Sequence, residues 1–342
     1  MPTFCRHNRF AENCPICSKA ERTRPGTVGG AAGKASRRPA RAASAPAPKR
    51  RSRAGDLVVR RQARAADDGY DHELVPGLRA SADAVRLAAE LAFSAARLRE
   101  LEADPPGLHA AAASAPDREE GLWLAFLIAY LSPLEADDPW AGIEAARTPW
   151  GLEALPSLDG VELGPRSSHE ARRGTATLEA YRTRADRAGS QAALLGGEGS
   201  LTPQRRFDRA FERLQLAGFS RGARYEFLLA AGRLGLVDVE PWSLMFGLGE
   251  AGDRTTLAAK RVFGIGDPMN LRRRAAELAA AAEVPVAALD LALVNWALPS
   301  GERITAGATV EADPAVLARL RRVLGVPADL ATEGEGAAAP DA

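Results

Sequence analysis

Four residues near the N-terminus have the types and the spacing of a metal site. Cys5, His7, Cys14 and Cys17 form the pattern Cys-x-His-x6-Cys-x2-Cys, and the chain of 342 residues has no other cysteine. Two thiolates separated by two residues can bind one ion from a tight turn, and a third thiolate with an imidazole completes a tetrahedron. Such a set leaves no open coordination position, so we expect a structural Zn²⁺ in a knuckle at residues 1–20. A redox pair at Cys14 and Cys17, or thiols without metal, is the alternative.

A second candidate for chemistry is the carboxylate of Asp238, which follows two predicted helices joined by a tight turn. Gly218 marks the turn, because glycine adopts positive φ at low cost. Ser220 is the predicted N-cap of the second helix. The inner faces of the two helices carry Phe207, Phe211 and Leu214, then Ala223, Phe227, Ala230, Ala231 and Leu234. A helix that starts behind such a turn presents backbone N–H groups to an anion such as a DNA phosphate.

The segment Leu216-Ala217-Gly218-Phe219-Ser220-Arg221-Gly222, with Asp238 after the second helix, resembles the helix-hairpin-helix DNA glycosylase superfamily. The resemblance implies that DNA is bound by Gly218, Phe219, Ser220, Arg221 and Gly222. Ser220 replaces the family's second glycine, and Gly222 stands where lyase-type members keep a lysine. The resemblance therefore implies a monofunctional DNA N-glycosylase, a hydrolase in which Asp238 is the catalytic carboxylate. The alternative is an ordinary helical hairpin, with Asp238 as a helix cap before Pro241.

The expected base pocket follows an apolar helix predicted at Asp117–Leu131, which has acidic residues in its first turn. In the glycosylase superfamily a buried helix ends in a short polar turn that lines the base pocket. The resemblance implies that Tyr130, Ser132 and Glu135 face an extruded base. The alternative for these three residues is a buried helix with a polar end. Trp242 is a further candidate for this pocket as a stacking platform, or else a core residue.

A second turn rich in N–H groups is predicted at Lys260-Arg261-Val262-Phe263-Gly264-Ile265-Gly266. The cations Lys260 and Arg261 flank this turn, so a second phosphate contact through them, Gly264 and Gly266 is plausible. The two glycines are equally compatible with a plain turn.

Composition favours an all-α fold, because alanine dominates the 46% hydrophobic residues and aromatic residues make up only 6%. Residues 21–55 are a low-complexity segment that we expect to be a disordered basic linker, either binding DNA without sequence preference or simply solvated. Residues 56–330 are the predicted helical body, and residues 331–342 an acidic tail. No apolar run is long enough to span a membrane and no secretory segment is seen, so a cytoplasmic protein is expected.

The predicted body contains further helices whose limits can be compared with a structure. Ser81 is the expected N-cap of a helix that ends before Pro105. Arg- and Glu-rich residues predict a helix over 169–193, and Pro241 is suited to the first turn of another. Helices are also expected over 271–282, 286–298 and 313–324. His72 and His109 are lone histidines with no catalytic pattern around them.

A closer resemblance covers most of the chain outside the linker and the tail. The segments CRHNR…CPICS, DDGYDHELVPGLRAS, the hairpin and FGIGD…LDLALVNWAL are similar to the alpha-glutamyl/putrescinyl thymine pyrophosphorylases, a glycosylase-like branch tied to hypermodified thymine in phage DNA. This resemblance implies a two-lobed helical fold and excision of a modified base from double-stranded DNA, as in phage defence. The alternatives are a pyrophosphorylase or transferase acting on a thymine substituent, and a non-catalytic zinc-containing DNA-binding protein. The sequence identifies no protein partner.

Overall fold

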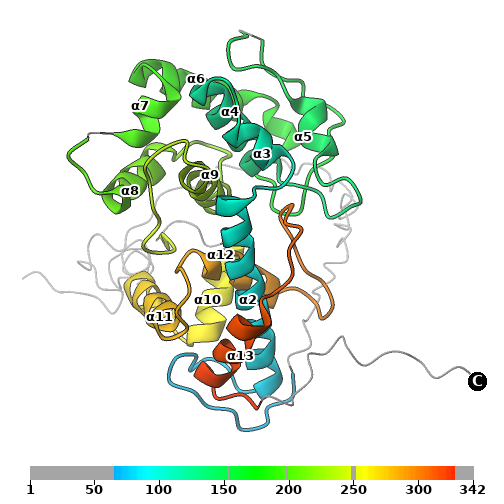
Figure 1. Ribbon diagram of the computed structural model, residues 1–342, viewed down its shortest axis with the longest axis vertical. Coiled ribbons are helices and arrows are strands. Elements are labelled where there is room, and N and C mark those ends of the chain that lie inside the picture. The colour runs from blue at the N-terminus through cyan, green and yellow to red at the C-terminus, as the bar shows by residue number, and fades with distance from the viewer. Residues whose placement is uncertain (1–64, 153, 198, 248–251, 328–342) are drawn as a thin grey trace, which may run out of the picture. The chain divides into compact units, whose positions relative to one another are not determined.

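The computed structural model describes residues 65–152, 154–197, 199–247 and 252–327 (Figure 1). The predicted zinc knuckle at 1–20, the basic linker at 21–55 and the acidic tail at 331–342 lie outside these residues. Contacts divide the chain between Val59 and Arg60, and every described residue belongs to the second unit.

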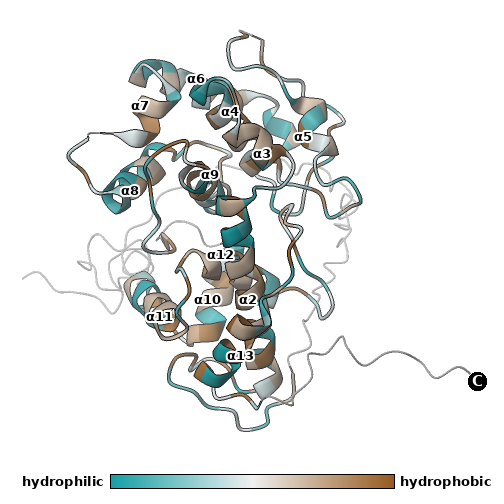
Figure 2. Ribbon diagram, in the orientation of Figure 1, coloured by the Kyte–Doolittle hydropathy of each residue, from teal (hydrophilic) through white to brown (hydrophobic). Residues whose placement is uncertain are grey.

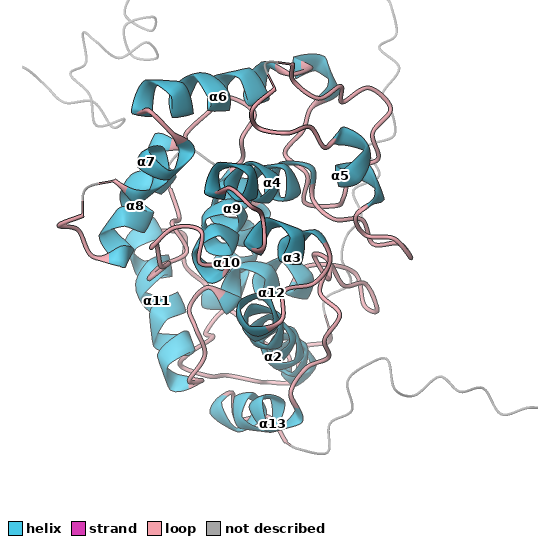
Figure 3. Cartoon of the chain, turned by 45° about the horizontal axis from the view of Figure 1, so that its top comes forward, coloured by secondary structure: helices cyan, strands magenta, loops and turns pink. Residues whose placement is uncertain are grey.

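The described residues form helices and no strand, which confirms the all-α prediction (Figure 3). In chain order these are α2 (Ser81–Ala103), α3 (Leu108–Ala113), α4 (Arg118–Leu131), α5 (Ala141–Ala146), the 3₁₀ helix η2 (Ala171–Arg173), α6 (Ala176–Ala188), α7 (Gln191–Gly196), α8 (Pro203–Arg213), α9 (Arg221–Arg233), α10 (Arg254–Phe263), α11 (Pro268–Ala281), α12 (Ala288–Trp296) and α13 (Pro314–Val323).

The helices pack in two neighbouring groups that share one long helix. In the first group α4 contacts α3, α5, α7 and α9, and α7 contacts both α6 and α8. In the second group α2 contacts α12 and α13, while α10 lies between α12 and α11. Because α2 also contacts α9, it joins the two groups through direct packing (Figure 1).

The core of the first group is built on α4, which is buried from Gly121 to Leu131 and is mainly hydrophobic (Figure 2). The ring of Phe126 stacks on that of Tyr181 from α6, with centroids 4.0 Å apart and an interplanar angle of 11°. Trp123 and Tyr130 extend this stack along α4. Each fully buried aromatic side chain contributes a few kcal/mol through area burial. The stack therefore fixes the end of α4, where Ser132 follows.

Side-chain caps define most helix starts, and the one predicted at Ser220 is confirmed. Ser220 caps α9, with its Oγ accepting from the N–H of Ala223 at 3.2 Å. Asp117 and Asp313 cap α4 and α13 in the same way. A cap of this kind is typically worth about 1 kcal/mol. The start of α9, which lies at the candidate site, is therefore fixed partly by local sequence.

Three predicted helix limits are wrong. The helix expected over 169–193 is broken into η2, α6 and α7, because Gly174 and Gly189 adopt φ values of 50° and 90° that end a helix. No helix starts at Pro241, and the next one, α10, begins at Arg254. The N-cap of α2 is Ala80 instead of Ser81, whose backbone N–H donates to the Asp68 carboxylate.

Candidate functional site

The turn between α8 and α9 is held in place by its glycine and by a serine from a distant loop. Gly218 has φ of 83°, and an added Cβ would lie 2.5 Å from Thr177 Oγ1. Ser168 Oγ donates to the Gly218 carbonyl at 2.9 Å and accepts from the Ser220 N–H at 2.7 Å. Sequence reasoning gave Ser168 no role, because its partners are 50 and 52 residues away. The turn is thus rigidly placed at the start of α9.

Only some of the predicted DNA-binding residues of this turn reach solvent. Phe219 is buried in the aromatic core, 5.0 Å from the Phe126 ring, and Arg221 is fully buried. Neither side chain can therefore meet a phosphate in this conformation. Ser220 is exposed, and Gly218 and Gly222 are partly exposed. A phosphate here would be bound by backbone groups and Ser220.

Arg221 instead belongs to a buried network of opposite charges. Its guanidinium forms ion pairs with Asp290 and with Asp253, the latter at 2.9 Å. It also donates to the Leu244 carbonyl at 2.8 Å and to Thr255 Oγ1 at 2.8 Å. This arginine therefore ties the start of α9 to the starts of α10 and α12.

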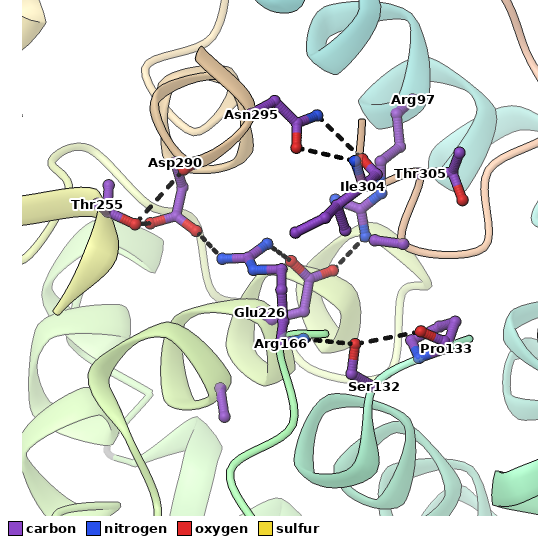
Figure 4. Close-up of polar contacts among 12 residues, drawn as sticks. Arg97, Ser132, Pro133, Arg166, Glu226, Thr255, Asp290, Asn295, Ile304 and Thr305 are labelled. Atoms are coloured by element: carbon purple, nitrogen blue, oxygen red, sulfur yellow. Dashed lines mark hydrogen bonds and ion pairs between the residues drawn. The ribbon is translucent and has the colours of Figure 1, made fainter. Parts of the chain in front are cut away.

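The same network continues through Arg166 and Glu226 (Figure 4). Arg166 Nη2 lies 2.5 Å from Asp290 Oδ2, and its Nη1 lies 3.3 Å from Glu226 Oε2. Arg97 forms an ion pair with the other carboxylate oxygen of Glu226. The three arginines Arg97, Arg166 and Arg221 thus face the three carboxylates Glu226, Asp253 and Asp290, and their formal charges cancel.

The electrostatics of the network keep both of its most buried carboxylates ionised. Burial favours the protonated form of Asp290, but Arg221 and Arg166 outweigh it and lower the pKa of this carboxyl. Burial likewise opposes ionisation of Glu226, and Arg97 and Arg166 lower its pKa. Because these charges are nearly removed from water, the loss of one partner would leave the others uncompensated.

A hollow lies beside this network, where the end of α4 meets the start of α9. It encloses about 310 Å³ when the open space at its mouth is counted. The space left inside it fits about one water molecule. Its wall includes His109, Ser132, Arg166, Gly222, Glu226 and Ala306. A smaller hollow shares His109 and Ala306 with it and is also lined by Arg97 and Glu100.

Of the four residues predicted for the base pocket, Ser132 lines this hollow and the other three do not. Tyr130 is buried, and its hydroxyl lies 3.0 Å from His169 Nδ1. Glu135 is exposed, and its carboxylate accepts from the backbone N–H groups of Thr305 and Ala306. Trp242 is 50% exposed and therefore is not a core residue. The structure does not bring the four together in one pocket.

Asp238 lies on the surface at the far end of α9 from the Gly218 turn. Its side chain is 69% exposed and forms an ion pair with Arg206 in the first turn of α8. The 13 residues of α9 rise about 20 Å between the two ends. Asp238 lines neither hollow. The chain after Asp238 comes back to the start of α9 at Leu244, whose carbonyl accepts a hydrogen bond from Arg221.

The second predicted phosphate contact is placed at the junction of α10 and α11. Lys260 and Arg261 are partly exposed, and the Arg261 guanidinium lies over the Trp296 ring at 5.2 Å. Gly264 adopts φ of 62° as the C-cap of α10, and Gly266 is exposed. The carboxylate of Asp267 caps α11 and accepts from the Asn270 N–H at 2.9 Å. This carboxylate takes the position at the helix start that a phosphate would occupy.

Comparisons with family models, with curated proteins and with solved structures give no match to this chain. Within the described residues, no group of three or more His, Cys, Asp or Glu side chains is placed to bind a metal ion. In that same part of the chain, none of the helices combines the length and the apolar character needed to cross a membrane.

Proposed function

We propose that the protein binds double-stranded DNA and excises a modified base from it, with Asp238 as the carboxylate that stabilises the cationic sugar. The observation that carries this proposal is an exposed carboxylate and a half-exposed indole that are each bonded to a side chain of α8. Arg206 of α8 binds Asp238, and Asp208 of the same helix accepts from Trp242 Nε1 at 2.8 Å. An indole face can stack on an extruded base, and a carboxylate stabilises positive charge as the glycosidic bond breaks.

The exposed face of α8 supports DNA as the partner. Arg205 and Arg209 are exposed, and neither forms an ion pair with another described residue. They lie on α8 between the Asp238 end and the Gly218 turn. Unpaired arginines bind phosphates and release counterions, which gives a salt-dependent affinity for DNA. Because Arg205 adjoins Arg206, the partner of Asp238, a duplex bound to this face would lie close to that carboxylate.

Replacing Asp238 tests the chemistry directly. Asp238→Asn is expected to lower base release from DNA that carries hypermodified bases by at least about a hundredfold, because the positioned charge is lost. Binding of the same DNA should change little. Glu240→Gln is the matched control, since Glu240 is an exposed carboxylate two residues away that accepts from Gln204 Nε2. Base release is measured by mass spectrometry of the free base and by counting abasic sites.

A non-catalytic DNA-binding protein is the second candidate function. It is favoured by the position of Asp238, which lines neither hollow and lies at the other end of α9 from the turn. It predicts DNA binding with no change to any base, in the wild type as well as in Asp238→Asn. A base altered but kept in the strand would instead support transferase or pyrophosphorylase chemistry.

We also propose that Cys5, His7, Cys14 and Cys17, which lie outside the described residues, hold a structural Zn²⁺. The spacing of the four side chains supports this ligand set, and it leaves no position open for catalysis. Purified wild-type protein is expected to contain one zinc ion per chain, and Cys14→Ser or Cys17→Ser to lose it. Metal content measured by elemental analysis decides between zinc and free thiols.

A further inference from the structure

The wall of the hollow beside the buried charge network contains a buried histidine whose ring nitrogens form no hydrogen bond with the described residues. His109 of α3 is 1% exposed, and neither ring nitrogen has a hydrogen-bond partner within the described residues. Its ring meets the edge of Trp140 at 5.3 Å and lines both hollows. A buried polar atom without a partner costs about 1–3 kcal/mol. Such a group is expected to have a partner that enters the hollow.

The backbone at two other points of the same wall is strained. Ser132 has φ of 62° and Ala306 has φ of 53°, values that residues with a side chain seldom adopt. Each costs on the order of 1–3 kcal/mol, and such residues cluster at binding and catalytic sites. Within the described residues Ser132 Oγ makes only two hydrogen bonds, both long at 3.4 Å, so its hydroxyl remains available to a ligand.

The charges of the wall indicate what kind of ligand fits. Glu226 and Arg166 are already paired with each other and with Arg97 and Asp290. The network is neutral overall, so an added charge in the hollow would have no free counter-charge. His109 is neutral as well, because burial lowers its pKa to about 4. A neutral imidazole offers one donor and one acceptor, which suits an uncharged polar group.

We propose that this hollow binds the polar end of an uncharged small molecule, a hydroxyl or carbonyl group that hydrogen-bonds to His109 and Ser132. The inner space admits about one such group, while the rest of the molecule occupies the open part of the hollow. Gly222 lines this hollow, and a Cβ added there would lie 3.7 Å from Arg166 Nη2 of the same wall, so a larger side chain would take up space in the hollow. This binding requires neither DNA nor Asp238.

The test uses a series of pyrimidines that differ only in the substituent at the 5-position. 5-Hydroxymethyluracil carries a polar uncharged substituent at this position and thymine an apolar one. The substituent of 5-carboxyuracil is anionic and that of 5-aminomethyluracil is cationic. The full-length protein is labelled with ¹⁵N in its histidine rings, and the His109 signals are assigned with His109→Leu. The hydroxymethyl compound is expected to shift these signals saturably, with an affinity at least about tenfold above the two charged analogues.

Two variants and one measurement with a DNA duplex serve as controls for this binding experiment. Gly222→Leu should abolish the shift without altering His109 itself, and His72→Leu should leave it unchanged. The same substituent in a DNA duplex tells whether the group arrives on a free molecule or on a base in DNA. The proposal is overturned if the His109 ring signals shift with none of the four free probes and not with the duplex. It is also overturned if the shift is still seen in Gly222→Leu. Loss of base release in Asp238→Asn bears on the proposed glycosylase activity alone.

Discussion

Acid is expected to destabilise this protein through one buried histidine. Burial, helped by Arg97, lowers the pKa of His109 from 6.5 to about 4 in the folded chain. In the unfolded chain His109 becomes protonated below about pH 6.5, whereas in the folded chain it stays neutral down to about pH 4. The free energy of unfolding therefore falls as the pH drops below 6.5. This loss of stability ends once the pH falls below about 4, the pKa of His109 in the folded chain.

The size of this effect follows from the pKa difference. Each pKa unit corresponds to about 1.4 kcal/mol, which gives about 3 kcal/mol over the whole range and about 2 kcal/mol between pH 7 and 4.5. The carboxyls of Asp290 and Glu226 do not obscure this window. Their pKa values are lowered from 3.8 and 4.5, so their contributions are lost only as the pH falls below those starting values.

The assay is urea unfolding followed by circular dichroism at several pH values from 7 to 4.5. His169 also has a pKa lowered by burial, so the wild type is compared with His109→Leu and not judged alone. The variant should lose about 2 kcal/mol less over this range. His109→Gln, which is polar but does not titrate there, should show the same reduced dependence whatever its absolute stability. Equal pH dependence in all three proteins would refute the assignment.

Three further sets of substitutions test the network, the turn and the DNA surface. Asp290→Asn should cost about 3–5 kcal/mol in urea unfolding, because it removes a partner from both Arg166 and Arg221 and leaves the buried network with an excess positive charge, whereas Asp71→Asn, in an exposed pair, should cost under about 1 kcal/mol. Gly218→Ala should cost at least about 2 kcal/mol, because its Cβ meets Thr177, while Gly235→Ala, with φ of 69° but open space around it, should cost about 1 kcal/mol; equal losses would contradict the packing argument. Arg205→Ala and Arg209→Ala should each lower the salt dependence of DNA affinity by about one counterion, as fluorescence anisotropy measures, and an unchanged slope would remove α8 from the interface.

Local sequence predicted the features of the fold that depend on neighbouring residues. The Ser220 cap, the Gly218 turn and the end of α2 before Pro105 each follow from the chemistry of one or two adjacent positions. The break between η2 and α6 escaped prediction, although Gly174 marks it. Helix-forming residues on both sides of that glycine suggested a continuous helix, and a single glycine is only a weak signal.

The candidate site could not be predicted in the same way, because its partners are far apart in the sequence. Arg166 and Asp290 are separated by 124 residues, and Arg221 and Asp290 by 69. The family resemblance implied a DNA contact for Arg221, but this side chain is buried, although arginine is a residue type found mostly at the surface. His109 gave no signal at all, since its importance comes from burial without a partner. That environment is created by tertiary packing, in which α3 lies against α4 and the His109 ring against Trp140.

The neutral set of three arginines and three carboxylates also constrains how the chain can change over evolutionary time. A single replacement within it leaves one buried charge uncompensated, so a tolerated change must remove one positive and one negative member together, as when an ion pair gives way to two apolar residues. Related chains that lack an arginine at position 221 should therefore also lack one of its two partners, the aspartates at positions 253 and 290. Joint substitution at such distant positions would indicate that a related chain has the same buried contacts, even where the surrounding sequence has diverged.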